Sequence, residues 1–250
     1  MIRPSSVVPP SASDPPVSCH ALIPCAGSGS RLPGDVPKQY RRLLGDCVVQ
    51  HTVRAFLRLP RIATVSVVVQ AGDALAASCL QSHPRLRLVP RGGASRAHSV
   101  LGGLDALLEA GAQPADWVLV HDAARCCVTP RLIDALIDAC STDASGGLLA
   151  LPLPDTLKLA DAQGRVVRTE PREGRWLAQT PQMFRLAALH AALQSAIAAG
   201  VPPTDEAGAM ERLGARPRLV PGAAFNVKIT YPEDLELAQA VLAQRAGEPA

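Results

Sequence analysis

Aromatic residues are scarce in this chain, at 3% of its 250 residues. Aliphatic side chains must therefore fill the core, and a hydrophobic content of 48% is enough to form one. Apolar runs near the roughly 20 residues that a membrane-spanning helix needs are absent. Charge of one sign is not in excess either, because 25 basic residues face 22 acidic ones. We therefore expect neither a nucleic-acid partner nor a membrane partner.

Paired cysteine motifs are missing as well. The seven cysteines are scattered, and none forms a C-x-x-C pair or a zinc-finger spacing. We expect reduced thiols, typical of a cytoplasmic protein, and no metal–thiolate site. Cys126 and Cys127 are adjacent, and two interpretations stay open, a redox pair or two small apolar side chains, of which the second is favoured.

The N-terminal segment is rich in proline and serine and lacks the apolar stretch of a signal peptide. We expect residues 1–17 to be a disordered tail of a cytoplasmic protein. The remaining pattern predicts one domain over residues 18–246. A bifunctional enzyme is not expected, because 250 residues leave no room for a second catalytic domain after the last helix.

Short apolar runs alternate with helical patterns along this domain. Such a pattern predicts an α/β fold, with a Rossmann-like, largely parallel twisted sheet flanked by helices. Ligands of these folds bind at the carboxyl ends of the strands. Strands are expected at 19–24, 64–70, 86–89, 117–121, 147–151, 218–220 and 226–229. Helices are expected at 49–59, 73–81, 95–109, 130–140, 186–199 and 232–244, and a further helix is expected to end at residue 213.

The alternation is interrupted at about residues 152–175. Two short extended runs, 156–160 and 165–169, flank a polar turn at Asp161–Gly164, which predicts an inserted β-hairpin arm. An isolated hairpin has too few partners to be stable. The arm should therefore pack against something else, such as another subunit.

A glycine-rich loop follows the first expected strand. Gly27 and Gly29 let backbone N–H groups approach an anion, and Arg31 and Lys38 bring positive charge to the same place. The loop lacks the Lys-Ser/Thr pair of a P-loop, and Leu32 stands where a dinucleotide-binding loop has its third glycine. This arrangement predicts binding of a nucleoside triphosphate.

Another strand end carries an acid and a base. The run His121–Arg125 follows an apolar strand, and a carboxylate such as Asp122 is a natural Mg²⁺ ligand beside a triphosphate. A turn-capping role for Asp122, paired with Arg125, stays open as the alternative. A His-Asp hydrolase is not favoured, because the sequence has no G-x-S-x-G motif.

These motifs resemble the signature of cytidylyltransferase-type nucleotidyltransferases, and most closely that of the 2-C-methyl-D-erythritol 4-phosphate cytidylyltransferase family. They occur in the order of that family and span nearly the whole chain after the tail. The matching segments are A-G-x-G-x-R at 26–31, P-K at 37–38, G-G-x-x-R-x-x-S at 92–99, H-D-A-A-R at 121–125, D-T-x-K at 155–158, R-x-x-x-W at 172–176, T-P-Q at 180–182, T-D-E at 204–206 and N-x-K-I-T at 226–230.

Departures from the family pattern are mild. Cys25 replaces a small alanine, and Ala94 stands where an acid is frequent. Cys126 and Cys127 replace a pair that contains proline. None of these changes removes a charged group that the chemistry needs.

The resemblance implies a role for each matching residue. Catalytic roles fall to Arg31, Lys38, Arg172 and Lys228. The nucleotide would be bound by Cys25, Ala26, Gly27, Gly29, Gly93, Ala94, Ser99 and Asp122. The acceptor substrate would be bound by Asp122, Arg125, Thr156, Arg172, Thr204 and Lys228, and Asp122 would also hold the metal. Asp205 and Glu206 belong to the matching T-D-E segment, and they fit equally well as ordinary acids in the first turn of a helix.

The resemblance also implies an activity. It predicts an enzyme that transfers a cytidylyl group from CTP to 2-C-methyl-D-erythritol 4-phosphate with Mg²⁺, as a homodimer joined through the arm. One alternative keeps this chemistry with another acceptor, such as ribitol 5-phosphate. A nucleotide-binding regulator without catalysis is less favoured, because a binder needs no charge at the leaving group.

Overall fold

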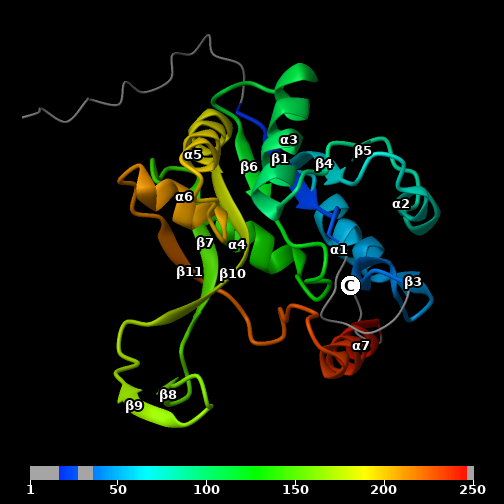
Figure 1. The fold of residues 1–250 in the computed structure, drawn as a ribbon. Coiled ribbons are helices and arrows are strands. Elements are labelled where there is room, and N and C mark those ends of the chain that lie inside the picture. The colour runs from blue at the N-terminus through cyan, green and yellow to red at the C-terminus, as the bar shows by residue number, and fades with distance from the viewer. Residues whose placement is uncertain (1–16, 28–35, 247–250) are drawn as a thin grey trace, which may run out of the picture.

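The computed structural model describes residues 17–27 and 36–246. A seven-stranded sheet forms its centre, in the order β11-β7-β10-β6-β1-β4-β5 (Figure 1). All neighbouring strands are parallel except β10, which is antiparallel to β6 and β7. The expected largely parallel sheet is therefore confirmed. The strands are β1 (Cys19–Pro24), β4 (Ile62–Val68), β5 (Leu86–Val89), β6 (Trp117–Val120), β7 (Gly147–Pro152), β10 (Trp176–Arg185) and β11 (Arg218–Pro221).

Helices cover both faces of the sheet. One face packs against α1 (Val48–Leu57), α2 (Ala74–Cys79) and α4 (Pro130–Cys140), and the other against α3 (Arg96–Glu109), α5 (Leu186–Ala198) and α6 (Glu206–Arg212). Within β1, Ala21 and Ile23 belong to the first core cluster and Leu22 to the second. This alternation is the period of a strand buried on both sides.

The last helix, α7 (Pro232–Ala246), packs on a third, smaller cluster. That cluster includes Cys126, Cys127 and Ile229, all buried. The two adjacent cysteines therefore serve as small apolar side chains beneath α7. No disulfide joins their thiols.

Side-chain caps fix where several helices begin. Asp73, Ser95, Thr129 and Asp205 each accept a hydrogen bond from a backbone N–H in the first turn of α2, α3, α4 and α6, respectively. Pro130 follows its cap at the first position of α4, where its missing N–H costs nothing. Local sequence places these starts, and the expected starts of α2, α3 and α4 agree with the structure to within one residue.

Strand β10 was not expected from the sequence. Pro181 lies in its middle, and a proline there argues against a central strand because it cannot donate to the ladder. In the structure the register with β7 shifts between Ala178 and Gln182, so Pro181 lies in an irregular stretch where no ladder hydrogen bond is required of it.

The strand expected at residues 226–229 is absent. These residues form an irregular segment that is held by individual contacts instead of a ladder. The Ile229 N–H donates to the Ala124 carbonyl at 2.9 Å, and the Asn226 side chain donates to the Thr180 carbonyl at 2.9 Å. The apolar alternation of this segment reflects packing against α7, which sequence periodicity does not distinguish from a strand.

The expectation that all cysteines are reduced is wrong for one pair. Cys47 and Cys79 form a disulfide, with Cα atoms 5.7 Å apart. Cys47 precedes α1 and Cys79 ends α2, and the short 3₁₀ helix η1 (Lys38–Tyr40) lies against both helices. A separation of 32 residues carries no signal for such a pairing.

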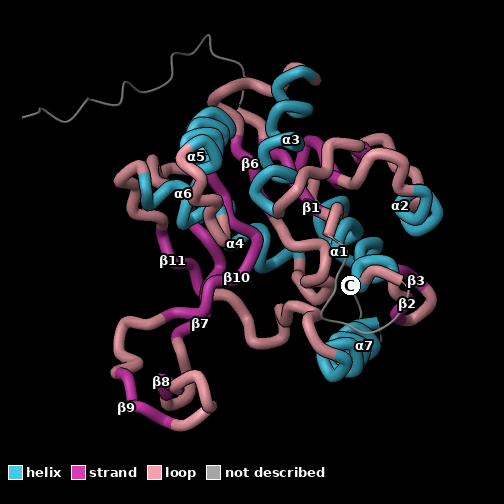
Figure 2. Tube along the Cα trace, in the orientation of Figure 1, coloured by secondary structure: helices cyan, strands magenta, loops and turns pink. Residues whose placement is uncertain are grey.

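The arm projects away from the rest of the chain, beyond the ends of β7 and β10 (Figure 2). Its strands are β8 (Leu157–Ala160) and β9 (Val166–Glu170), which pair antiparallel and confirm the expected hairpin. The turn is stabilised by Asp161, whose carboxylate accepts from two backbone N–H groups, and by Gly164 at a φ of 75°. A second small pairing joins β2 (Arg42–Leu43) and β3 (Asp46–Cys47).

No helix in the described part of the chain has the length and apolar character needed to cross a membrane.

Candidate active site

A cavity of about 590 Å³ opens at the carboxyl ends of β1, β4, β5 and β6. Chain segments that follow these four strands line it, together with η1 and the segment at 226–229. β1 lies between β4 and β6, so the strand order reverses direction at this place. Such a switch point is where open α/β sheets bind their ligands.

Two glutamines hold the loop after β1. Gln39, which is buried in η1, donates from Nε2 to the Cys25 carbonyl at 3.0 Å and to the Gly27 carbonyl at 2.7 Å. Gln70 donates to the Ala26 carbonyl at 3.3 Å. Cys25, Ala26 and Gly27 all line the cavity, as expected for nucleotide-binding residues. Gly29 and Arg31 lie outside the described residues. No motif in the sequence indicates that Gln39 and Gln70 support this loop.

The loop before α3 approaches the first loop closely. A Cβ on Gly92 would lie 2.4 Å from the Ala26 Cβ and 2.9 Å from the Val69 carbonyl oxygen, so only glycine fits there. The Gly93 N–H donates to the Ser99 hydroxyl at 3.1 Å, and that hydroxyl donates to the Ser95 carbonyl at 3.0 Å. Gly93, Ala94 and Ser99 line the cavity. The Ser99 hydroxyl also stabilises the loop through these two hydrogen bonds.

Three cations surround the carboxylate of Asp122. Oδ1 accepts from Arg96 Nε at 2.9 Å, and Oδ2 accepts from Lys228 Nζ at 2.9 Å. Arg125 Nε lies 3.6 Å from Oδ2. Arg96 also donates from both Nη atoms to the buried carboxylate of Glu206, at 2.6 and 3.0 Å. Glu206 is therefore not the ordinary first-turn surface acid that the sequence allowed.

Ionisation in this cluster follows from these contacts. Burial alone would raise the pKa of Asp122, but Arg96 and Lys228, with Arg125 behind them, hold that pKa well below its usual range. Burial likewise opposes charge on Arg96, yet Glu206 and Asp122 outweigh it and raise the pKa of its guanidinium. Both groups are charged at neutral pH, so Asp122 stays an anion beside the cations that contact it.

His121 is linked to Asp122 through the Thr180 hydroxyl and carries no charge. Burial lowers the pKa of His121 to about 4. Nε2 donates to the Arg125 carbonyl at 3.1 Å, which leaves Nδ1 to accept from the Thr180 hydroxyl at 3.0 Å. The Thr180 oxygen accepts in turn from the Asp122 N–H at 3.1 Å. His121 therefore belongs to the scaffold behind the site.

Two lysines converge on the cavity from distant parts of the chain. Lys38 in η1 donates to the Ile229 carbonyl at 2.7 Å, and Lys228 is the residue before it. The chain has only three lysines against 22 arginines. Lysine is therefore rare in this chain, and two of its three lysines line the cavity.

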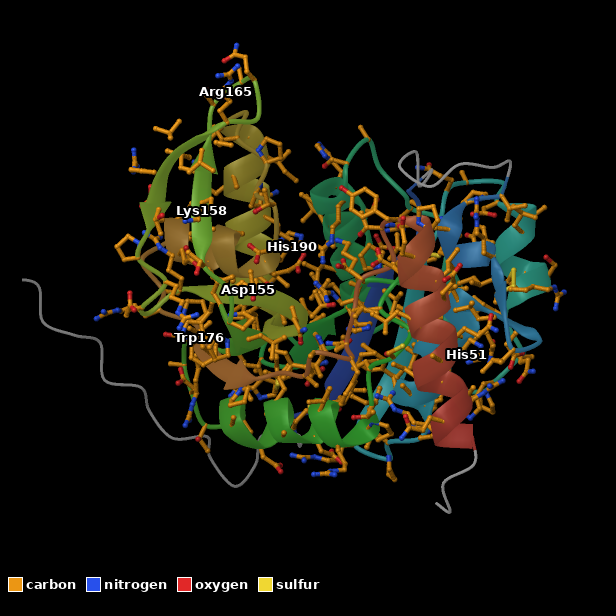
Figure 3. All side chains as sticks on the ribbon, turned by 90° about the horizontal axis from the view of Figure 1, so that it is seen from below. His51, Asp155, Lys158, Arg165, Trp176 and His190 are labelled. Atoms are coloured by element: carbon orange, nitrogen blue, oxygen red, sulfur yellow. A yellow bond between two sulfur atoms is a disulfide. The ribbon has the colours of Figure 1, made fainter. Side chains whose placement is uncertain are left out.

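The remaining expected acceptor residues lie elsewhere in this chain. None of Arg125, Thr156, Arg172 and Thr204 is among the described residues that line the cavity. Arg125 donates to the Asn226 carbonyl at 2.7 Å and so anchors the segment that carries Lys228. Thr156, Arg172 and Thr204 are exposed, and Arg172 donates to the Pro154 carbonyl within the arm. Figure 3 shows Arg165 at the tip of the arm, Lys158 along it and Trp176 nearer the sheet.

The residues present fit a magnesium ion only together with a phosphate-bearing ligand. Asp122 is the one carboxylate among the described lining residues, and no cluster of three metal-ligating side chains occurs in the described ranges. Mg²⁺ commonly binds through one or two carboxylates and the phosphates of its substrate. Asp122 suits that mode, because it is ionised and faces the cavity.

Comparison with known proteins now identifies the family. The model of the family 2-C-methyl-D-erythritol 4-phosphate cytidylyltransferase (IspD) matches residues 19–244. The chain belongs to this family. The match begins at β1 and runs into α7, so it includes every element that lines the cavity.

Curated relatives of this family cover the chain closely. The 2-C-methyl-D-erythritol 4-phosphate cytidylyltransferase of Chromobacterium violaceum is 52% identical over 225 residues, which are 90% of this chain and 98% of the relative. The bifunctional enzyme IspD/IspF of Albidiferax ferrireducens is 55% identical over 234 residues, which are 94% of this chain. The chain spans 55% of that relative's length.

A solved structure agrees with the fold. The crystal structure of a 4-diphosphocytidyl-2C-methyl-D-erythritol synthase matches with a TM-score of 0.81 and 39% identity, over 92% of this chain and 100% of the other. The α/β fold of the family and its central mixed sheet are thus shown for this chain, which is a nucleotidyltransferase.

Proposed function

We propose that this chain transfers the cytidylyl group of CTP to 2-C-methyl-D-erythritol 4-phosphate and releases pyrophosphate. The observation that carries the proposal is the convergence of Lys38, Lys228 and Asp122 with the loop at Gly93 on one cavity. Both reactants are anions, so their encounter requires positive charge held in place before they bind. Family membership and the printed names of the relatives support the choice of these two substrates.

In this proposal the base binds between the two loops. Cys25 and Ala26 after β1 and Gly93, Ala94 and Ser99 before α3 line the same part of the site. Backbone groups from such loops recognise the edge of a pyrimidine without a side-chain carboxylate. For this reason alanine at position 94 is compatible with CTP.

The triphosphate and the acceptor phosphate meet at the cations. An oxygen of the acceptor phosphate attacks the α-phosphorus, the bond from that phosphorus to the bridging oxygen breaks, and pyrophosphate leaves with the electron pair. Lys38 and Arg31 stabilise the charge that spreads over the reacting phosphoryl group, and Lys228 aligns the attacking phosphate. No general base is needed, because the phosphate is already ionised.

Asp122 would hold Mg²⁺ together with phosphate oxygens of the nucleotide. When bound, the ion would neutralise negative charge on the phosphates. Lys228 forms an ion pair with Asp122 in this structure. Its ammonium group becomes available to a phosphate once another cation binds the Asp122 carboxylate.

We further propose a homodimer in which the arm completes the site of the neighbouring subunit. Thr156 and Arg172 are exposed and lie outside the cavity of their own chain, and Val166 and Val167 expose 63% and 57% of their surface. Arg172 would grip the acceptor phosphate in bidentate fashion, with Thr156, Thr204 and Arg125 near it. The cytoplasmic location stays a prediction from the sequence.

Steady-state pyrophosphate release tests the proposal. CTP, Mg²⁺ and 2-C-methyl-D-erythritol 4-phosphate are expected to give turnover, and replacing the acceptor by ribitol 5-phosphate is expected to abolish most of it. Faster turnover of ribitol 5-phosphate would transfer the proposal to the other acceptor. Binding of CTP without release from any acceptor would instead support a nucleotide-binding regulator.

A further inference from the structure

Arg96 and Glu206 form a buried ion pair directly behind the proposed reaction site. Arg96 lines the cavity, whereas Glu206 is fully buried and is not among the described lining residues. The two residues are 110 positions apart in the sequence, and neither was assigned a role from it. Glu206 can therefore influence the cavity only through the guanidinium that it holds.

The geometry of the Arg96 guanidinium determines which hydrogen bonds it donates to Asp122. Both Nη atoms of Arg96 donate to Glu206, so only Nε points to Asp122 Oδ1. A guanidinium is planar, and its fork of two parallel N–H groups prefers a carboxylate in bidentate contact. Without Glu206, the fork would be free to turn onto Asp122 and take both of its oxygens, including the one that faces Lys228.

Glu206 is itself rigidly placed. Gln182 on β10 donates from Nε2 to the Asp205 carboxylate at 2.9 Å and accepts from the Ala207 N–H at 2.7 Å. Asp205 also caps α6 by accepting from the Gly208 N–H at 2.9 Å. The first turn of α6 is thereby fixed on β10, with Glu206 pointing to Arg96.

We propose that Glu206 is a positioning residue for nucleotidyl transfer, which engages the fork of Arg96 so that Asp122 keeps one oxygen for Lys228 or a metal ion. This inference rests on the proposed function, because it assigns a task to Asp122 in that reaction. Stability alone is a weak reason for the pair, since well-packed apolar residues often replace buried ion pairs without loss.

Glu206→Gln tests the inference, because it keeps the size of the side chain and removes its charge. Occupation of both Asp122 oxygens by the freed Arg96 fork is expected to lower kcat by about 10- to 100-fold. The Kd for CTP, measured by calorimetry without acceptor, is expected to change by less than about threefold, since the base loops are untouched. A role confined to folding would lower the melting temperature and would leave kcat per folded molecule unchanged.

Asp116→Asn is the matched control. Asp116 is also buried, and it accepts from the backbone N–H groups of Ser18 and Gln113 and contacts His20 at 3.1 Å, at the opposite end of β6. It should destabilise the fold and leave kcat per folded molecule within about twofold. An equal kcat loss in this control would overturn the inference.

A second pair of variants covers the case in which Glu206→Gln does not fold. Arg96→Met and Arg96→Met with Glu206→Met remove the cation alone or the whole pair. If Glu206 acts only through Arg96, the double variant is no slower than the single one, whereas independent roles would multiply the losses. A double variant that is clearly slower than Arg96→Met alone would overturn the inference.

Wild-type turnover separates this inference from the proposed function. If the wild-type enzyme releases no pyrophosphate from CTP and 2-C-methyl-D-erythritol 4-phosphate, the proposed function fails before any variant is compared. If the wild type turns over and Glu206→Gln keeps its kcat within about twofold, the function stands and only the positioning role fails.

Discussion

The cavity and the arm contain similar charged side chains in opposite surroundings. At the cavity, Asp122 and Glu206 are buried and hold Arg96 between them. On the arm, Arg168 and Glu170 pair at 2.6 Å with the arginine 62% exposed, and Arg172 reaches only a carbonyl of the arm itself. The first region is organised by its own chain. The second presents groups whose proposed task lies in another chain.

Energetics separate the two regions in the same way. A buried ion pair is costly unless its polar atoms are matched, and at the cavity Nε and both Nη atoms of Arg96 each have a carboxylate partner. Exposed pairs contribute little, about 0 to 1 kcal/mol, and a two-stranded hairpin is marginal by itself. The function proposed for the cavity therefore depends on preformed geometry, while the function proposed for the arm depends on association. The following predictions test that division.

Lys38→Met should have the largest effect. Removing a charge that acts on the transition state is expected to lower kcat by about 100- to 1000-fold, with a much smaller change in CTP affinity. Steady-state kinetics and calorimetry measure the two quantities. Arg61→Met is the control, because Arg61 pairs with Asp134 and Asp138 on α4, outside the cavity lining. Equal losses in kcat and affinity for Lys38→Met would favour simple binding.

A mixed dimer tests whether the arm serves the neighbouring subunit. Arg172→Met and Lys38→Met homodimers should each be inactive, whereas a heterodimer of the two variants should regain about half of the wild-type sites, because one of its two cavities has Lys38 and receives an intact arm. The heterodimer is isolated with two affinity tags and assayed for pyrophosphate release. An inactive heterodimer would show that Arg172 acts within its own chain.

Gly92→Ala should weaken nucleotide binding through the loops alone. Its Cβ would overlap Ala26, so the loops must separate, and an increase of about 10-fold in the Kd for CTP is expected with a stability loss of about 1 to 3 kcal/mol. Gly103→Ala is the control, since it crowds Leu22 and Val68 between α3 and the sheet. Comparable weakening in the control would assign the effect to general destabilisation.

A decrease in pH should destabilise the region around His121 and should have no such effect on the arm, which contains no histidine. The pKa of His121 falls from 6.5 to about 4 on folding, so the unfolded chain binds the extra proton first as pH decreases. The contribution of neutral His121 to the free energy of unfolding should be fully present above pH 6.5. The free energy of unfolding should then decrease by about 3 kcal/mol as pH falls to 4. Urea titrations measure it, and His121→Asn should flatten the decrease over this range.

The parts of the fold that depend on local sequence were predictable. The caps Ser95 and Asp73, the alternating burial of β1 and the turn at Gly164 each arise from contacts within a few residues. Lys38, Lys228 and Asp122 were assigned by resemblance, and the structure brings them to one cavity. By contrast, β10 was missed because Pro181 contradicts a central strand, and the segment at 226–229 was misread because apolar packing imitates a strand pattern.

By itself, the sequence determined most of the strands and helices, the glycine-rich segment after β1 and the hairpin insertion, because helix caps, turn residues and hydrophobic periodicity act over short distances. Only the tertiary structure decided that Glu206 is a buried partner of Arg96, that Cys47 meets Cys79, and that Arg125 anchors the segment carrying Lys228. These pairings join residues that are far apart in the chain, and no local preference encodes which distant charge or thiol will fill a neighbouring position once the sheet has assembled.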